Sequence, residues 1–193
     1  VNIRGLKRMA VDNAPANTVP VPEKAEATGK RIAIIGGGPS GLAAAYYLEL
    51  MGHHAVVFEA KSKLGGMLRY GIPSYRFPRE RLDQDIEVIL STGVEVHLNT
   101  KIGNGEGEVP FIKLREEFDA VYIAIGAHED KKVGIEGEDS KGVISAVEML
   151  GSIGEEVMPD FKDKTVVVIG GGNVAMDCTR SAIRLGAKKV TIA

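Results

Sequence analysis

The sequence has few of the residues that mark several classes of protein. It has one cysteine, Cys178, among 193 residues, and no tryptophan. A single cysteine excludes an internal disulfide framework and a cysteine-only metal or iron–sulfur cluster within this chain, and it favours a reducing, cytoplasmic setting. Apolar runs such as 166–169 have the length of a strand, so no membrane span is expected. The net charge of -2 gives no electrostatic reason to expect nucleic acid as a partner.

Glycine, in contrast, is plentiful, with 24 residues, and much of it lies in two compact clusters. The stretch 13–29 holds three prolines and few large apolar side chains, which is typical of an extended connector, and a short helical turn is expected before it, at 6–11. The chain starts without Met and ends in an apolar run. We therefore expect it to be part of a longer polypeptide.

The first glycine cluster lies within a strand–turn–helix–strand pattern. The apolar run 31–35 predicts a buried strand, 36–41 a glycine turn, 42–51 a helix, and 55–58 a second buried strand that ends at Glu59. Such a sequence of elements in about 30 residues is a βαβ unit.

This cluster matches the dinucleotide fingerprint G-x-G-x-x-G at Gly36, Gly38 and Gly41. The first glycine permits the tight turn, the second lets the backbone approach a pyrophosphate, and the third lets helix and strand pack closely. Glu59 stands where a carboxylate can accept hydrogen bonds from a ribose. The fingerprint does not decide between FAD and NAD. A glycine pair at 65–66 is compatible with close passage of the chain along a cofactor or with a plain loop turn.

The same order of elements returns near the end of the chain. A strand at 165–169, a glycine turn at 170–172, a helix at 173–185 and a strand at 189–192 are expected, with G-x-G-x-x-A at Gly170, Gly172 and Ala175. Counting from the glycines pairs Gly36 with Gly170 and puts Ala193 at the place of Glu59. Because a 2'-phosphate would be repelled by a carboxylate, Ala193 favours NADP over NAD.

Between the two units the pattern is weaker. We expect a Gly-, Pro- and Tyr-rich loop at 61–78, a helix at 79–92, a strand at 94–98, a buried strand at 120–125 and a short helix at 145–150. The basic run Arg69, Arg76, Arg79 and Arg81 is explained most simply as a solvated face at a helix start.

Four further side chains have competing explanations. His53 and His54 follow a glycine between helix and strand, and we expect them to be solvated and not to bind a metal. No metal ligand set is predicted. Cys178 has no partner and is expected to be a buried structural thiol. Asp177 either orients the backbone or a cofactor, or is a favourable charge near a helix N-terminus.

Four motifs together resemble the glutamate synthase small (beta) subunit group, which includes the flavin half of dihydropyrimidine dehydrogenase. They are IIGGGPSG at 34–41, GGMLRYGIP at 65–73, AIG at 124–126 and VIGGGNVAMD at 168–177. The resemblance covers nearly the whole chain. It implies an α/β fold, with a Rossmann-like FAD-binding domain at 31–130 after a linker segment at 1–30, and the start of a Rossmann-like NAD(P)-binding domain at 131–193.

The resemblance also assigns cofactor contacts, although it leaves catalytic residues unknown. FAD is expected to be bound by Gly36, Gly38, Pro39, Ser40, Gly41, Glu59, Ala60, Gly65, Gly66, Met67, Arg76, Val96, Ala124 and Gly126. NADPH is expected to be bound by Gly170, Gly171, Gly172, Asn173 and Val174.

The function implied by the resemblance is that of an FAD-dependent oxidoreductase module, which takes hydride from NADPH and passes electrons to an iron–sulfur partner. That partner would be a domain outside these residues, a glutamate synthase large subunit or a ferredoxin-like acceptor. The alternative is a nucleotide-binding regulatory or assembly module without turnover. A flavin disulfide reductase is disfavoured, because no C-x-x-x-x-C pair follows the first unit.

Overall fold

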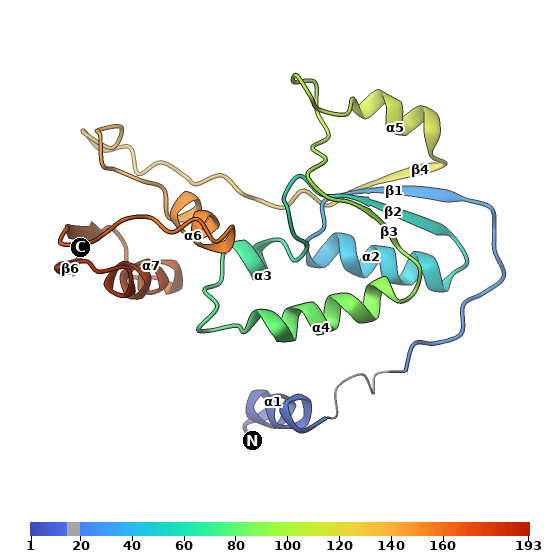
Figure 1. The fold of residues 1–193 in the computed structure, drawn as a ribbon, viewed down its shortest axis with the longest axis horizontal. Helices are drawn as coiled ribbons and strands as arrows, with labels where there is room; N and C mark the ends of the chain where they lie inside the picture. Colours follow the sequence, from blue (N-terminus) through green and yellow to red (C-terminus); the bar gives the residue numbers. More distant parts are fainter. Residues whose placement is uncertain (15–19) are drawn as a thin grey trace.

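A computed structural model describes residues 1–14 and 20–193 and shows two parallel sheets (Figure 1). The larger sheet has the order β3-β2-β1-β4, and the smaller pairs β5 with β6. The strands are β1 Arg31–Ile35, β2 His54–Phe58, β3 Glu95–His97, β4 Ala120–Ile123, β5 Thr165–Val168 and β6 Lys189–Ile192. The helices are α1 Ile3–Asn13, α2 Pro39–Leu50, α3 Met67–Tyr70, α4 Arg79–Leu90, α5 Phe111–Glu117, α6 Ala146–Gly154 and α7 Asn173–Arg184. The expected α/β class and the Rossmann-like arrangement are confirmed.

Helices cover both faces of the larger sheet (Figure 1). Successive side chains of a strand point to opposite faces. Ile34 of β1 therefore packs with α2 and α4, whereas Ala33 packs on the other side with Leu114 of α5. Burial on both faces explains why β1 and β2 are continuous apolar runs.

The strand expected at 120–125 differs from the prediction. It ends at Ile123 and is not buried, since Tyr122 and Ile123 are 42% and 59% exposed. The reason is its place in the sheet: β4 is the edge strand beyond β1. The helices α3 and α5 were not predicted. Each is short, and α5 buries only Leu114, so neither repeats an apolar position often enough to show a helical period.

The second βαβ unit has its own small core. Met149 and Leu150 of α6 pack with Phe161 and with Cys178 and Ala182 of α7. The expectation of a buried thiol is confirmed. Burial raises the pKa of Cys178 to about 11, with a further contribution from the carboxylate of Asp177. The thiol is therefore protonated at neutral pH.

The connector after residue 19 is attached to the amino ends of the first unit's strands. The backbone N–H of Ala25 donates to Leu50 (2.8 Å), and that of Thr28 donates to Gly52 (2.9 Å). Lys24 forms an ion pair with Glu49, whose side chain is only 3% exposed. Before the connector, α1 is longer than the turn expected at 6–11, and none of its residues is buried. In the described part of the chain, we find no helix with the length and apolar character needed to cross a bilayer.

Candidate functional site

The first glycine turn lies at the carboxyl end of β1, close to the end of β4. Gly36 has φ +107°, and a Cβ added to it would overlap the carbonyl oxygen of Ala124. A Cβ on Gly41 would in turn overlap the carbonyl oxygen of Gly36. These two glycines are therefore required by the packing of β1 against β4 and α2, as the fingerprint predicts.

Gly38 is in a different position. It is the N-cap of α2 with φ -80° and ψ -176°, a conformation open to any residue. A Cβ on Gly38 would meet one atom within 4 Å, the Cα of Gly66 at 3.6 Å. Packing within the described residues therefore does not explain this glycine. The open space beside it lies at the N-terminus of a 12-residue helix, where unpaired N–H groups favour an anion. The turn thus fits a diphosphate.

The glycine pair at 65–66 closes onto this turn. The N–H of Gly65 donates to the carbonyl of Gly37 (2.9 Å). A Cβ on Gly66 would lie 2.7 Å from the Cα of Gly38, and both members of the pair have positive φ, +121° and +52°. Only glycine allows this approach of two backbones. Met67 follows at once as the first residue of α3.

Glu59 follows β2 directly and lies beside the turn, with 7% of its surface exposed. Its Oε2 accepts from the N–H of Gly37 (2.7 Å), and its Oε1 accepts from the N–H of Lys61 (2.8 Å). Each carboxylate oxygen can accept a second hydrogen bond. The position is therefore compatible with the expected ribose contact. Ala60 is next in sequence, and Val96 lies on the neighbouring strand β3, paired with Val57.

The second glycine turn repeats this geometry in a more open form. Gly170 has φ +115°, and Gly172 is the N-cap of α7 with φ -81° and ψ -179°, close to the values of Gly38. A Cβ on Gly170, Gly171 or Gly172 would meet no described atom within 4 Å. Asn173 and Val174 form the first turn of α7. The backbone conformation fits a second diphosphate.

The strand register corrects the position assigned to Ala193. In the first unit, the N–H of Gly36 donates to the carbonyl of Phe58; in the second, the N–H of Gly170 donates to that of Ala193. Ala193 therefore stands at the place of Phe58, one residue before the place of Glu59. Counting from the glycines was wrong by one. Ile34 of β1 pairs with Val57, whereas Val168, the equivalent residue of β5, pairs with Ile192, one residue further along than counting predicts. The identity of residue 193 carries no preference between NAD and NADP.

The basic run is not uniformly solvated, since Arg69 is buried whereas the side chains of Arg76 and Arg81 are 43% and 38% exposed. Arg69 is 5% exposed and donates to the carbonyl of Leu64 and to the carboxylate of Asp83. Arg79 donates to the main-chain carbonyls of Leu68 in α3 (2.9 Å) and of Ile72 in the loop that follows (2.7 Å). Arg76 donates from Nη1 to Oδ2 of Asp177 in α7 (2.6 Å). Sequence reasoning missed these pairs because the partners are distant along the chain or are main-chain atoms.

The two adjacent histidines have different partners. Nδ1 of His53 lies 2.7 Å from the hydroxyl of Thr28, and Nε2 of His54 lies 3.0 Å from the carboxylate of Glu95. Glu95 also contacts His97, and both imidazoles lower its pKa. Within residues 1–14 and 20–193 no three His, Cys, Asp or Glu side chains are arranged to hold a metal ion.

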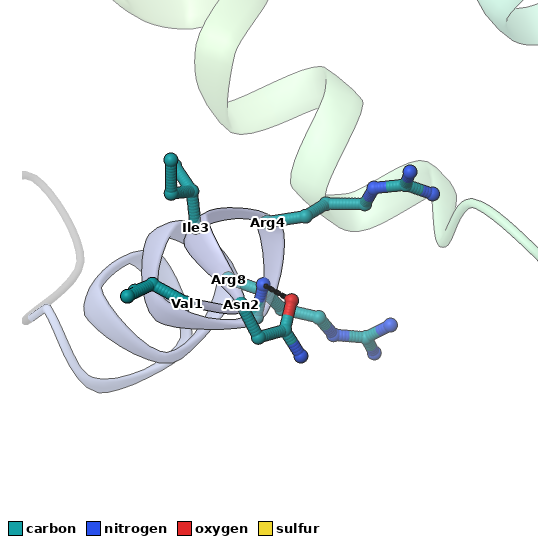
Figure 2. A pocket seen from close by; sticks show the side chains of 6 residues that line it. Val1, Asn2, Ile3, Arg4 and Arg8 are labelled. Carbon is teal, nitrogen blue, oxygen red and sulfur yellow. Dashed lines mark hydrogen bonds between the residues drawn. The ribbon is translucent and has the colours of Figure 1, made fainter.

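A hollow lies away from both glycine turns, at the start of α1 (Figure 2). It has a volume of about 530 Å³ and is lined by residues 1–5 and by Arg8. Asn2 caps the helix by accepting from the N–H of Gly5 (2.9 Å). The hollow is wide open and carries no acid–base pair, so it is not the centre of the chemistry.

Two βαβ units with glycine turns define a dinucleotide-binding fold, and comparison with known proteins places the chain within one family. The sequence model of the pyridine nucleotide-disulphide oxidoreductase family matches residues 22–193. The chain belongs to this family. The match agrees with the expected class of NAD(P)H-dependent flavin oxidoreductases, and it supports FAD and NADP as cofactors.

Several curated relatives are similar over most of the chain. It is 47% identical to the beta subunit of an NADP(+)-dependent formate dehydrogenase from Moorella thermoacetica over 84% of its length. It is 43% identical to the beta subunit of an NADPH-Fe(3+) oxidoreductase from Geobacter sulfurreducens over 100% of its length. It is 39% identical to the small chain of Escherichia coli glutamate synthase [NADPH] over 86%. The expected relation to the glutamate synthase small subunit is confirmed.

The relatives are longer than this chain. It spans 23%, 29% and 37% of these three proteins. Among solved structures, Mycobacterium tuberculosis FprA in complex with NADPH has a TM-score of 0.69 and 27% identity, covering 84% of this chain and 42% of that one. The fold is therefore shared with an oxidoreductase that has been seen with NADPH.

Proposed function

We propose that residues 31–130 bind FAD and residues 131–193 contribute to an NADPH site, in an oxidoreductase module that supplies electrons to an iron–sulfur partner. The observation that carries the proposal is the repeat of one glycine-turn geometry at the carboxyl ends of β1 and β5. The N-caps Gly38 and Gly172 have the same backbone conformation, and each opens a 12-residue helix.

At the first turn, the protein's contribution is to bind and orient the flavin nucleotide. The open side of Gly38 and the N-terminus of α2 receive the diphosphate. Glu59, already fixed by two backbone N–H groups, accepts a ribose hydroxyl. Ala124 lies beside Gly36, and Gly126 follows two residues later in the chain; both would cover this side of the site.

At the second turn, Gly170 to Val174 receive the diphosphate of NADPH by the same physics. FAD, when bound, supplies the redox chemistry by accepting a hydride from NADPH and releasing electrons singly. The small chain of glutamate synthase and the beta subunit of NADPH-Fe(3+) oxidoreductase are among the similar proteins. They favour a partner subunit or domain with iron–sulfur clusters, such as a glutamate synthase large subunit.

The test is the visible absorption spectrum of the purified protein before and after addition of FAD, followed by anaerobic titration with NADPH. We expect a bound-flavin spectrum that is bleached by NADPH, and oxidation of NADPH when an artificial one-electron acceptor is added. Loss of the bleaching in a Gly172→Leu variant that still binds FAD would assign the reductant to the second turn.

A protein that binds FAD and NADPH but never shows bleaching would instead be a nucleotide-binding module without turnover. A protein that ignores FAD at every concentration would contradict the assignment of the first turn.

A further inference from the structure

A partly buried charge pair joins the loop between α3 and α4 to helix α7 of the second unit. Arg76 donates to Asp177 across 101 positions of sequence, at 2.6 Å. The Asp177 side chain is 7% exposed and that of Arg76 is 43% exposed. Figure 1 shows the loop after α3 extending towards α7. The pair is therefore shielded from water on one side and links parts of the chain that hold different nucleotides in the proposed function.

A second contact supports the pair from the adjacent residue. The hydroxyl of Tyr75 donates to the main-chain carbonyl of Asp177 (3.3 Å), and the guanidinium of Arg184 lies 3.8 Å from the centroid of the Tyr75 ring. Tyr75 and Arg76 thus contact α7 at two positions along the helix, Asp177 and Arg184. A two-point contact restricts rotation of α7 in a way that one ion pair does not.

Both ends of this contact are connected to a glycine turn by short, hydrogen-bonded paths. On the flavin side, Gly66 touches Gly38 and opens α3, and the guanidinium of Arg79 binds main-chain carbonyls at both ends of residues 68–72. On the other side, Asp177 lies one turn into the helix that starts after Gly172. The joint therefore fixes the position of one turn relative to the other.

One oxygen of the pair is still available. Within the described residues, Oδ1 of Asp177 is buried and has no hydrogen-bond partner. A buried acceptor without a partner is unusual and costs free energy. Stability of the isolated helix therefore does not explain this carboxylate.

We propose that Arg76 and Asp177, with Tyr75 and Arg184 beside them, form a positioning joint that sets the distance between the flavin and the nicotinamide. This inference rests on the proposed function and deepens it. The four residues act by orienting α7, since hydride transfer requires the reacting atoms to be held in one geometry and a small misplacement slows it steeply.

The experiment compares Arg76→Met, Arg76→Lys and Asp177→Asn with a matched control, Asp119→Asn. Asp119 forms an exposed ion pair with Lys30 within the first unit (2.8 Å), away from the glycine turns. Three quantities are measured on the FAD-loaded protein: flavin content, the dissociation constant for NADPH, and the rate of flavin reduction by stopped flow. Hydrogen exchange of residues 71–78 is measured separately without NADPH.

We expect Asp177→Asn to keep its FAD and its affinity for NADPH, to reduce flavin about tenfold to a hundredfold more slowly, and to exchange faster at 71–78. Arg76 is also an expected FAD contact, so the rate of Arg76→Met is compared per bound flavin and should be slowed to a similar degree. Arg76→Lys should recover part of the rate, and Asp119→Asn should behave as wild type. Arg76 is half-exposed, so the Arg76→Met variant stays informative even where the buried Asp177→Asn variant fails to fold.

Wild-type reduction rates in Arg76→Met, or unchanged exchange at 71–78, would overturn the joint while leaving the proposed function intact. Loss of FAD from Arg76→Met alone, with a normal rate in Asp177→Asn, would also overturn it and assign Arg76 to the flavin. A wild-type flavin that NADPH never reduces would overturn both the proposed function and the joint.

Discussion

Two glycines of one motif should respond oppositely to the same substitution. In Gly38→Ala the new methyl group meets only the Cα of Gly66 at 3.6 Å, an ordinary contact, and φ of -80° suits alanine. We expect the free energy of unfolding of the FAD-free protein to change by less than about 0.5 kcal/mol. In Gly41→Ala the methyl group overlaps the carbonyl oxygen of Gly36 and approaches Ile34, so α2 must move. Overpacking of this kind costs about 1–3 kcal/mol or more.

The affinity for FAD should also separate the two variants. For a given loss of stability, Gly38→Ala should weaken FAD binding more than Gly41→Ala does. The methyl group of Gly38→Ala occupies the space proposed for the diphosphate, and losing one charge-assisted hydrogen bond costs about 1.5–3 kcal/mol, which is about tenfold to a hundredfold in the dissociation constant. Urea denaturation of the FAD-free protein and quenching of flavin fluorescence measure the two effects. Equal destabilisation by both variants, or undiminished FAD affinity in Gly38→Ala, would refute the reasoning.

Three further predictions concern side chains outside the glycine turns. Cys178, with its pKa raised to about 11, should react with a thiol reagent at pH 8 only slowly until urea unfolds the protein; fast labelling of the folded protein would contradict its burial. Glu49→Gln removes the charge that faces Lys24 of the connector and should lower the free energy of unfolding, measured by urea denaturation, by about 1–3 kcal/mol. An unchanged free energy of unfolding would show that the ion pair is not formed. His54 and His97 lower the pKa of Glu95, so its contribution to stability is present above the usual carboxyl pKa and is lost as pH falls through the lowered value. The stability difference between wild type and Glu95→Gln should therefore shrink in acid, and a difference independent of pH would count against it.

The regular parts of the fold could be predicted because local pattern and tertiary role agree in them. β1 and β6 have the predicted bounds, and α2, α4 and α7 lie within a few residues of theirs. Buried parallel strands are recognisable as short apolar runs, and glycine turns mark where they end. The two βαβ units were therefore readable from sequence.

What sequence could not predict depends on contacts between distant residues. Burial of Arg69 depends on Asp83 and on a main-chain carbonyl, and burial of Glu49 depends on Lys24 and the N–H of Ala55. A charged side chain carries no sign of such partners in its own neighbourhood. The same holds for strand exposure, since the apolar run of β4 is that of an inner strand although β4 lies at the sheet edge.

The one-residue error at Ala193 has a related cause. Gly186 and Gly52 occupy equivalent turns, with φ of +90° and +80°, so the two units agree up to that point. The pairing of β6 then shifts by one residue against β5. Counting from a motif assumes equal spacing, and a register shift in a strand is a property of the backbone ladder that side-chain identity does not reveal.

The pairing of β1 with β4 has a consequence for how the chain assembles during synthesis. Ile32 pairs with Ala120, and Gly36 receives its neighbour Ala124 from the same strand. The segment that begins the first unit must therefore wait for most of the next hundred residues to be made before its turn is complete. Non-local parallel pairing of this kind is slow, and domains generally fold as units during translation. A nascent chain halted before β4 should hold α2 against β1 yet leave its flavin site unfinished, so that the cofactor can be gained only late in the growth of the polypeptide.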